Sequence, residues 1–218
     1  MGTYHHGNLR PALVETAVGL AQASGPEGVV LREVARQTGV SHNAAYRHFA
    51  DRDELLAEVA QVAMLELAGA MTAEMAGVAE REPLPRAVAR LRATGRAYVH
   101  FALAQPGLFE VAFAAHGGVT LDDEPDEPAE PDESDEPEAE DDGPPEGDPY
   151  ALLGLVLDDL VRAGGVTTER RAGAEALCWS AVHGFAVLHL HGPLRDVPAD
   201  EREQSLELLL DQIQRGLL

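Results

Sequence analysis

Hydrophobic residues recur at helical spacing along most of the chain. The first stripe runs through residues 9–20 at intervals of four, four and three, which places its members on one face of a helix. This helix is expected to end at Gly25 and Pro26, because both residue types interrupt helices. No segment alternates hydrophobic and polar residues over a useful length, so the pattern predicts an all-α fold. The stripe consists of Leu9, Leu13, Ala17 and Leu20.

Two short helices are predicted directly after this stop. The first spans Leu31–Thr38 and ends at Gly39, which can adopt the positive φ that ends many helices. The second spans His42–Phe49, with Ser41 as its side-chain cap. Two short helices joined by a turn of three or four residues are the plan of a helix-turn-helix. In such a motif the N-terminal side chains of the second helix reach base edges in the major groove of DNA.

The second short helix contains almost no residue that would fill a core. A helix of this composition suits a surface that meets nucleic acid. We expect His42 and Asn43 to reach base edges, and Tyr46, Arg47 and His48 to contact phosphates. The alternative is a solvated surface helix without such a role.

Longer helices are predicted over the rest of the chain. The sequence Asp51-Arg52-Asp53-Glu54 has the form of a capping box and opens a long helix. A second helix is expected to stop at Pro106, and a third at Gly164-Gly165. The last two are expected over Thr168 to about Leu190 and over Asp200–Leu217.

The last two predicted helices carry more hydrophobic residues than one core requires. The first of them is apolar on two sides, which indicates a second buried surface. We therefore expect both helices to pair with their symmetry copies in a four-helix homodimer interface. A dimer also provides two recognition helices for half-sites about 34 Å apart. The expected interface residues are Leu177, Ala181, Phe185, Leu188, Leu206, Leu209, Leu210 and Ile213.

The N-terminal motif resembles the DNA-binding domain of TetR-type bacterial transcriptional regulators. The resemblance covers about residues 8–57 and is carried by Leu31–Ser41, Tyr46–Phe49 and Asp51–Leu56. It implies that His42, Asn43 and Ala45 face the groove, that Tyr46 and His48 touch phosphate, and that Phe49 belongs to the core. Val30 departs from the family, which commonly has Thr or Ser there. The DNA-binding residues expected in all are Arg32, Val40, Ser41, His42, Asn43, Ala45, Tyr46, Arg47, His48 and Arg52.

The C-terminal half resembles a ligand-binding domain of the same family. The run from Trp179 to His183-Gly184 is similar to a Trp-His-Gly signature, and Gln105–Phe109 is similar to a helix break of that domain. The resemblance implies a helical domain that dimerises and binds an unknown small apolar effector. Candidate pocket residues are Met64, Met71, Tyr98, Phe101, Phe109, Phe113, Trp179 and His183; each could equally be ordinary core, and His183 could be a hydrogen-bonded core histidine.

The charge of the chain is concentrated in one segment. The 38 acidic residues outnumber the 16 basic ones, all arginine, and the formal net charge is −22. Residues 122–148 hold sixteen acids and no base, so the remainder carries only −6, and residues 1–50 are near +1. We predict a disordered, proline-rich segment at about 117–149. It is either a solvated loop or a nucleic-acid mimic that competes for the arginine-bearing face.

The sequence offers no convincing catalytic or metal-binding constellation. Ser180 and His183 lie one turn apart near Glu175, but nothing supplies an oxyanion hole or a nucleophile elbow. His189 and His191 are two residues apart and diverge on a helix. Cys178 is interpreted as a buried small residue. We therefore expect no enzyme, no cofactor and no metal site.

These observations predict a regulator of transcription built from two parts. Residues 1–52 form the helix-turn-helix domain, and residues 53–218 form the effector and dimerisation domain. The expected function is sequence-specific binding to a double-stranded DNA operator by a repressor that a small apolar ligand releases. The alternative is a helical small-molecule carrier or interaction protein with weak or vestigial DNA binding. We expect a cytoplasmic protein without a membrane segment, because the longest apolar stretch, 172–192, contains Glu175 and three histidines.

Overall fold

A computed structural model describes residues 9–114 and 147–218 of the chain. All secondary structure in these two ranges is helical, which confirms the predicted all-α fold. The helices are α1 Leu9–Gly28, α2 Leu31–Thr38, α3 His42–Ala45, α4 Arg52–Ala76, α5 Pro83–Ala104, α6 Pro106–Ala114, α7 Pro149–Arg162, α8 Thr168–Arg171, α9 Ala174–Leu190 and α10 Ala199–Leu217.

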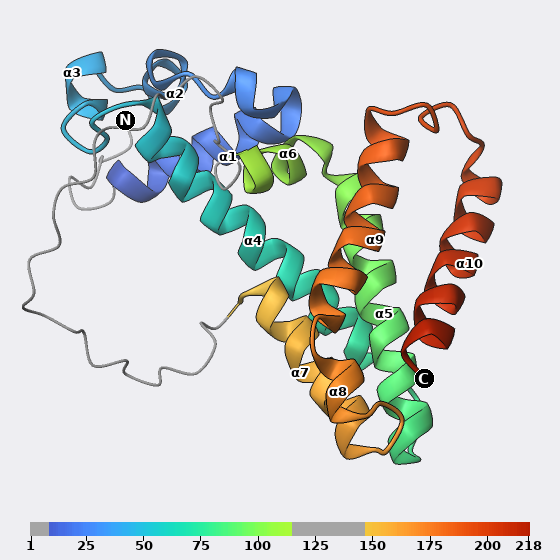
Figure 1. The fold of residues 1–218 in the computed structure, drawn as a ribbon. Coiled ribbons are helices and arrows are strands. Elements are labelled where there is room, and N and C mark those ends of the chain that lie inside the picture. The colour runs from blue at the N-terminus through green and yellow to red at the C-terminus, as the bar shows by residue number, and fades with distance from the viewer. Residues whose placement is uncertain (1–8, 115–146) are drawn as a thin grey trace, which may run out of the picture.

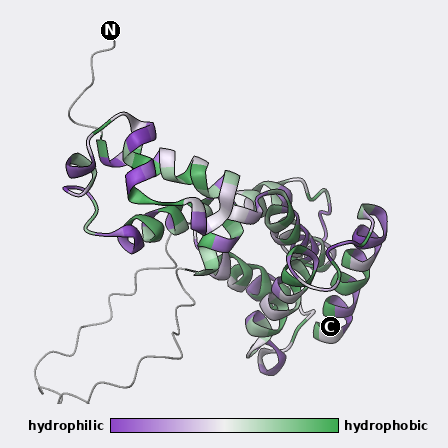
Figure 2. Ribbon diagram, turned by 90° about the horizontal axis from the view of Figure 1, so that it is seen from above, coloured by the Kyte–Doolittle hydropathy of each residue, from purple (hydrophilic) through white to green (hydrophobic). Residues whose placement is uncertain are grey.

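The molecule is elongated, and α4 connects its two ends (Figure 1). Helices α1, α2 and α3 gather around the first turns of α4, while α5, α7, α9 and α10 form a bundle around its last turns. Figure 2 shows hydrophilic and hydrophobic residues along the same helices, as expected where each helix has one buried face. By length and composition α4 could cross a membrane, but Leu55, Val59 and Leu67 are buried inside the fold, as in the central helix of a soluble protein.

Most predicted helix boundaries agree with the structure, and three do not. Gly25 has φ 65°, so the break expected there is present, although a further helical turn continues α1 to Gly28. The predicted helix His42–Phe49 is too long, since α3 ends at Ala45 and continues as tight turns. The predicted helix from Thr168 to Leu190 is split into α8 and α9, because Gly173 adopts φ 76°. A single glycine inside an apolar pattern carries too weak a signal to place such a break.

The acidic segment lies almost entirely outside the described residues. The described residues resume at Gly147, near the predicted end at about residue 149, and α7 begins at Pro149. The Asp148 carboxylate accepts the backbone N–H of Tyr150 at 2.8 Å and so caps α7. Pro149 occupies the first turn of α7 and is buried.

Three residues expected at the dimer interface belong to the core of a single chain instead. Leu206, Leu210 and Ile213 are at most 9% exposed, because α10 packs this face onto α5 and α9. Leu210 reaches Gly95 on α5 so closely that a Cβ at that glycine would lie 2.6 Å from the leucine Cδ2. The prediction that these three residues of α10 lie in the dimer interface is therefore wrong, because they pack against α5 and α9 of the same chain.

Helix α6 joins the two ends of the molecule through a contact that only glycine permits. Gly107 faces the backbone of α1, and a Cβ at this position would overlap the Ala21 carbonyl oxygen and lie 3.1 Å from the Gly25 nitrogen. Neither group is a flexible side chain that could move aside. Gly107 therefore sets the distance between α6 and α1, at the end of the molecule that holds α2 and α3.

We expect Gly107→Ala to lower the free energy of unfolding by about 1–3 kcal/mol, because the added methyl group meets backbone atoms. Denaturant unfolding followed by circular dichroism measures the change. Gly19→Ala on α1 is the matched control, since nothing lies within 4 Å of the added Cβ and alanine favours the helix by about 0.5–1 kcal/mol. Equal stability of the two variants would contradict the close contact.

Candidate DNA-binding surface and ligand cavity

The turn between α2 and α3 is built by three consecutive residues. Gly39 has φ 78° and ends α2, and Val40 donates its N–H to the Ala35 carbonyl at 2.9 Å. The Ser41 hydroxyl accepts the Ala44 N–H at 3.2 Å and starts α3. These contacts confirm the local signals expected at Gly39 and Ser41 and fix the angle between the two helices.

Helix α3 has one polar, exposed side and one buried side. His42, Asn43, Tyr46 and Arg47 are exposed on and just after the helix, and the rings of His42 and Tyr46 are 4.4 Å apart. The prediction that Ala45 faces the groove is wrong. Its side chain has no exposed surface, since it packs into the same core as Phe49 beneath α3.

The outer surface of α2 and α3 carries arginines that are not neutralised by acidic side chains of the described residues. Among the described residues, Arg32 and Arg47 have no ion-pair partner. Arg36 is different, since it binds Glu33 at 2.5 Å and holds the pKa of this carboxyl down at about 2. Two guanidinium groups without an ion pair to any described residue thus lie on a surface of short polar side chains, a composition that suits phosphate groups.

Arg10 at the start of α1 holds the turns that follow α3 in place, and no pattern in the sequence indicated this role. It donates to the His48 carbonyl, binds Glu58 at 2.7 Å and Glu54 at 3.2 Å, and its guanidinium lies 4.3 Å from the centre of the Phe49 ring. Glu54 also accepts the Ala50 N–H at 2.7 Å. The contacts are 38 or more residues apart in sequence, so no local pattern signals them.

Arg52 does not point toward the α3 surface in this structure. Its guanidinium donates to the carbonyls of Pro26 at 2.6 Å and Val29 at 2.9 Å, and so ties the link between α1 and α2 to the start of α4. A DNA contact by Arg52 would require it to leave both carbonyls. Val30 precedes α2 without a side-chain hydrogen bond, as its departure from Thr or Ser implies.

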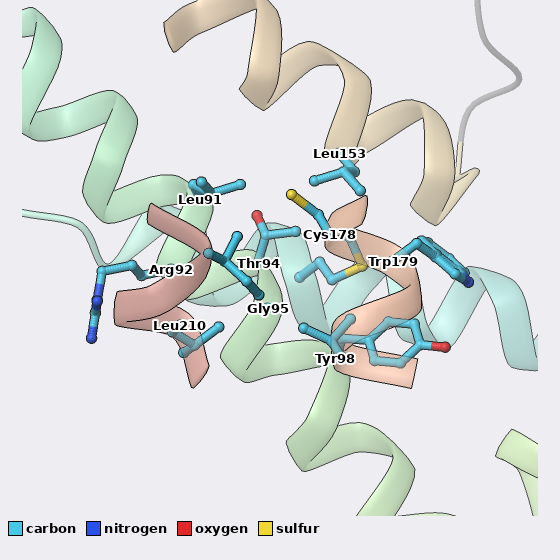
Figure 3. A pocket seen from close by; sticks show the side chains of 12 residues that line it. Leu91, Arg92, Thr94, Gly95, Tyr98, Leu153, Cys178, Trp179 and Leu210 are labelled. Carbon is cyan, nitrogen blue, oxygen red and sulfur yellow. The ribbon is translucent and has the colours of Figure 1, made fainter. Parts of the chain in front are cut away.

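The helical bundle encloses a small apolar cavity (Figure 3). Its volume is about 30 Å³, far below the roughly 300–1,000 Å³ of typical ligand sites. The aliphatic stem of Arg92 forms part of the wall, and its guanidinium points away. A ligand therefore has to displace side chains or helices. The lining residues are Met71, Leu91, Arg92, Thr94, Gly95, Tyr98, Leu153, Cys178, Trp179, Val182, Leu210 and Ile213.

Three of the eight expected pocket residues line this cavity: Met71, Tyr98 and Trp179. The other five are Met64, Phe101, Phe109, Phe113 and His183, and they do not line it. The periodic pattern could show that these residues face inward, but not which inward-facing residues surround the same space.

An aromatic cluster lies beside the cavity, between α5, α6 and α9. The Tyr98 hydroxyl lies 2.7 Å from His183 Nδ1, and Phe109 and Phe113 lie within 5.4 Å of the His183 ring. Burial lowers the pKa of His183 and raises that of Tyr98, so both groups are uncharged at neutral pH and share one hydrogen bond. The expectation of a hydrogen-bonded core histidine is consistent with this geometry.

The remaining reactive side chains form no catalytic or metal-binding arrangement in the part of the chain described. Ser180 is exposed, whereas His183 turns inward to Tyr98. Within the described ranges, no three His, Cys, Asp or Glu residues are grouped as metal ligands. Cys178 is buried, and burial together with the nearby Glu175 raises its pKa to about 11.

Comparison with known families identifies the class of the protein. Residues 13–59 match the bacterial regulatory proteins of the tetR family, and residues 91–213 match the tetracyclin repressor-like C-terminal domain. The second match alone covers more than half of the chain, and the chain belongs to the TetR family. It is a DNA-binding transcriptional regulator. The resemblance of Trp179, His183 and Gly184 to a Trp-His-Gly signature is not tested by these matches and stays a prediction.

Solved structures have the same fold. A protein of unknown function from a Rhodococcus species is 26% identical, with a TM-score of 0.71 over 100% of this chain and 99% of its own. TetR from Acinetobacter baumannii is 16% identical, with a TM-score of 0.56 over 98% and 96% of the two chains. PfmR from Thermus thermophilus is 18% identical, with a TM-score of 0.53 over 94% and 95%. A comparison with curated proteins gives no match.

We expect the thiol of Cys178 to react slowly in the folded protein. With its pKa at about 11, the thiolate population at pH 8 is roughly 100-fold smaller than for an ordinary cysteine. Iodoacetamide labelling followed by mass spectrometry measures the rate, and the chain in denaturant is the control. Equal labelling rates in the two conditions would contradict burial of Cys178 in the cavity wall.

Proposed function

We propose that the protein is a homodimeric, cytoplasmic repressor that a small apolar molecule releases from its operator. The observation that carries this proposal is the polar surface of α3, anchored from below by the buried Ala45 and Phe49. The proposal divides the chain at residue 52, where α4 begins, into the DNA-binding domain 1–52 and the effector domain 53–218. A variant of TetR from A. baumannii has been solved in complex with minocycline, which supports the binding of a small molecule here.

In this proposal the exposed side chains of α3 and of the turn after it make two kinds of contact with DNA. His42 and Asn43 at the start of α3 read base edges, and Tyr46 with Arg47 contacts phosphates. Arg32 on α2 adds a second guanidinium that forms no ion pair within residues 9–114 and 147–218. Ser41, Val40 and His48 hold the ends of the motif.

A continuous set of contacts connects the cavity to α1. Tyr98 lines the cavity, and its ring lies 5.7 Å from that of Phe109 on α6. Two residues earlier on α6, Gly107 meets the backbone of α1 at Ala21. A ligand that moves Tyr98 would thus shift the DNA-binding domain, and the coupling is worth about 1–3 kcal/mol in typical allosteric proteins.

An apolar face on α9 and α10 supports the homodimer. Leu177 and Leu188 are 52% and 44% exposed, although leucine side chains are normally buried. On α10 Leu208 is 61% exposed, a residue that the sequence analysis did not include. Ala181, Phe185 and Leu209 are partly exposed. The interface proposed here consists of these residues, without the three that are buried within the chain.

Asn43→Ala is expected to change which operator bases are preferred, at a cost of about 1–3 kcal/mol on the parent site. Tyr46→Phe is expected to weaken binding to all sequences alike, by about tenfold, since it removes one hydrogen bond to a charged group. Selection from randomised duplexes followed by fluorescence anisotropy measures both effects.

Gln204→Ala on α10 is the control, because it removes an exposed amide far from α3. Unchanged binding in both α3 variants would show that α3 is not the recognition helix. Absence of any selected sequence would favour a carrier with vestigial DNA binding.

Leu188→Glu is expected to convert the dimer to a monomer, because it places charge inside an apolar interface. Sedimentation velocity measures the molecular mass. Leu155→Glu on α7 is the matched control, since Leu155 is 49% exposed and lies outside the proposed interface. A dimer that survives Leu188→Glu but not Leu155→Glu would place the interface elsewhere.

A further inference from the structure

A second hollow lies where the first turns of α5 meet the last turn of α7, at the end of the bundle away from α3 (Figure 1). Its volume is about 310 Å³, roughly the lower limit of common ligand sites. Arg86, Arg90 and Arg162 line it together with Asp159. This hollow, which we call the arginine groove, is separate from the apolar cavity.

One carboxylate serves two of the three arginines. Arg90 binds one oxygen of Asp159 at 2.6 Å, and Arg162 binds the other at 2.5 Å. Arg86 is exposed and forms no hydrogen bond or ion pair through its side chain with any described residue. The four side chains therefore sum to a formal charge of +2 in a chain whose total is −22.

An arrangement that only tied α5 to α7 would need a single arginine for Asp159. Here the pair Arg90–Asp159 already joins the two helices, with 30% and 24% of the side chains exposed. Arg162 and Arg86 add charge without adding a connection between helices. Arginine forks suit carboxylate and phosphate oxygens, because their planar N–H groups bind two oxygens at once.

We propose that the arginine groove binds a small, doubly negative anion of the phosphate monoester class. The formal charge of +2 matches that of a dianion. Pro83, Ala87 and Ala163 form an apolar floor with room for the organic part of such a ligand. This site is independent of the apolar cavity and of the proposed effector.

Binding in the groove would act on the wall of the cavity. Arg90 directly precedes Leu91, and α7 contributes Leu153, so both helices that hold the anion also line the cavity. An anion that bridges Arg86 and Arg162 holds α5 and α7 together at one end. It stabilises the folded state by mass action.

Isothermal titration of the full chain with inorganic phosphate tests the site, at pH 7.5 and at an ionic strength held constant with sodium chloride. We expect saturable binding, and about tenfold weaker binding in Arg86→Gln, since that change removes a hydrogen-bonding cation without breaking any contact. Arg195→Gln is the matched control, because it removes the same charge from the loop after α9.

Asp159→Asn distinguishes an anion-binding site from an ion pair that only connects α5 to α7. It frees Arg90 and Arg162 and raises the charge of the groove from +2 to +3, so phosphate should bind more tightly although the α5–α7 connection is weakened. If the ion pair only connects the helices, Asp159→Asn would lower the stability of the fold without raising the affinity for phosphate. Thermal unfolding with and without phosphate measures both.

Three results would overturn the proposal. They are no saturable binding up to about 10 mM phosphate, equal affinity in Arg86→Gln and Arg195→Gln, and loss of binding in Arg47→Gln alone. The last result would assign the phosphate to the α3 surface, which is the surface that the proposed function uses. Operator binding by Arg86→Gln tests that function separately, and we expect it to be unchanged.

Discussion

The DNA-binding end of the molecule depends on what holds a helix of four residues in place. A helix as short as α3 has no stability of its own in water, because the first turn fixes several residues for a single hydrogen bond. Its order comes from the two buried side chains beneath it, Ala45 and Phe49, and from Arg10, which binds the His48 carbonyl at its end. The exposed side chains are free to meet DNA because none of them is needed for packing.

The contact between α6 and α1 also involves very few side-chain atoms. Gly107 brings the backbones of α6 and α1 together without an intervening side chain. No flexible side chain at this contact can therefore absorb a displacement of one helix relative to the other. The ring of Tyr98 meets that of Phe109 on α6 edge to face, with 5.7 Å between the ring centroids. In the proposed function, a change in the bundle would therefore move whole helices.

Local signals in the sequence were sufficient for the helices of the DNA-binding end. Gly39 and Ser41 place the turn, and the acidic capping box places the start of α4 within one residue. The periodicity of apolar residues shows which face of a helix is buried, but not which surface covers that face. It assigned Leu206 to a dimer contact although this residue fills the core. The family resemblance likewise placed Ala45 on the outside, and Arg10 was missed since its partners are distant in sequence.

The tightness of the apolar cavity has a consequence for how the regulator responds. With a cavity volume of only about 30 Å³, the effector of the proposed function would bind an expanded form of the bundle, in which side chains or helices have moved. Its apparent dissociation constant is the intrinsic one divided by the fraction of molecules in that form, so a form populated at about 1% raises the required concentration about 100-fold. In the proposed function, the side chains that narrow the cavity, Leu210 above Gly95 among them, would thereby set the ligand concentration at which the repressor leaves its operator.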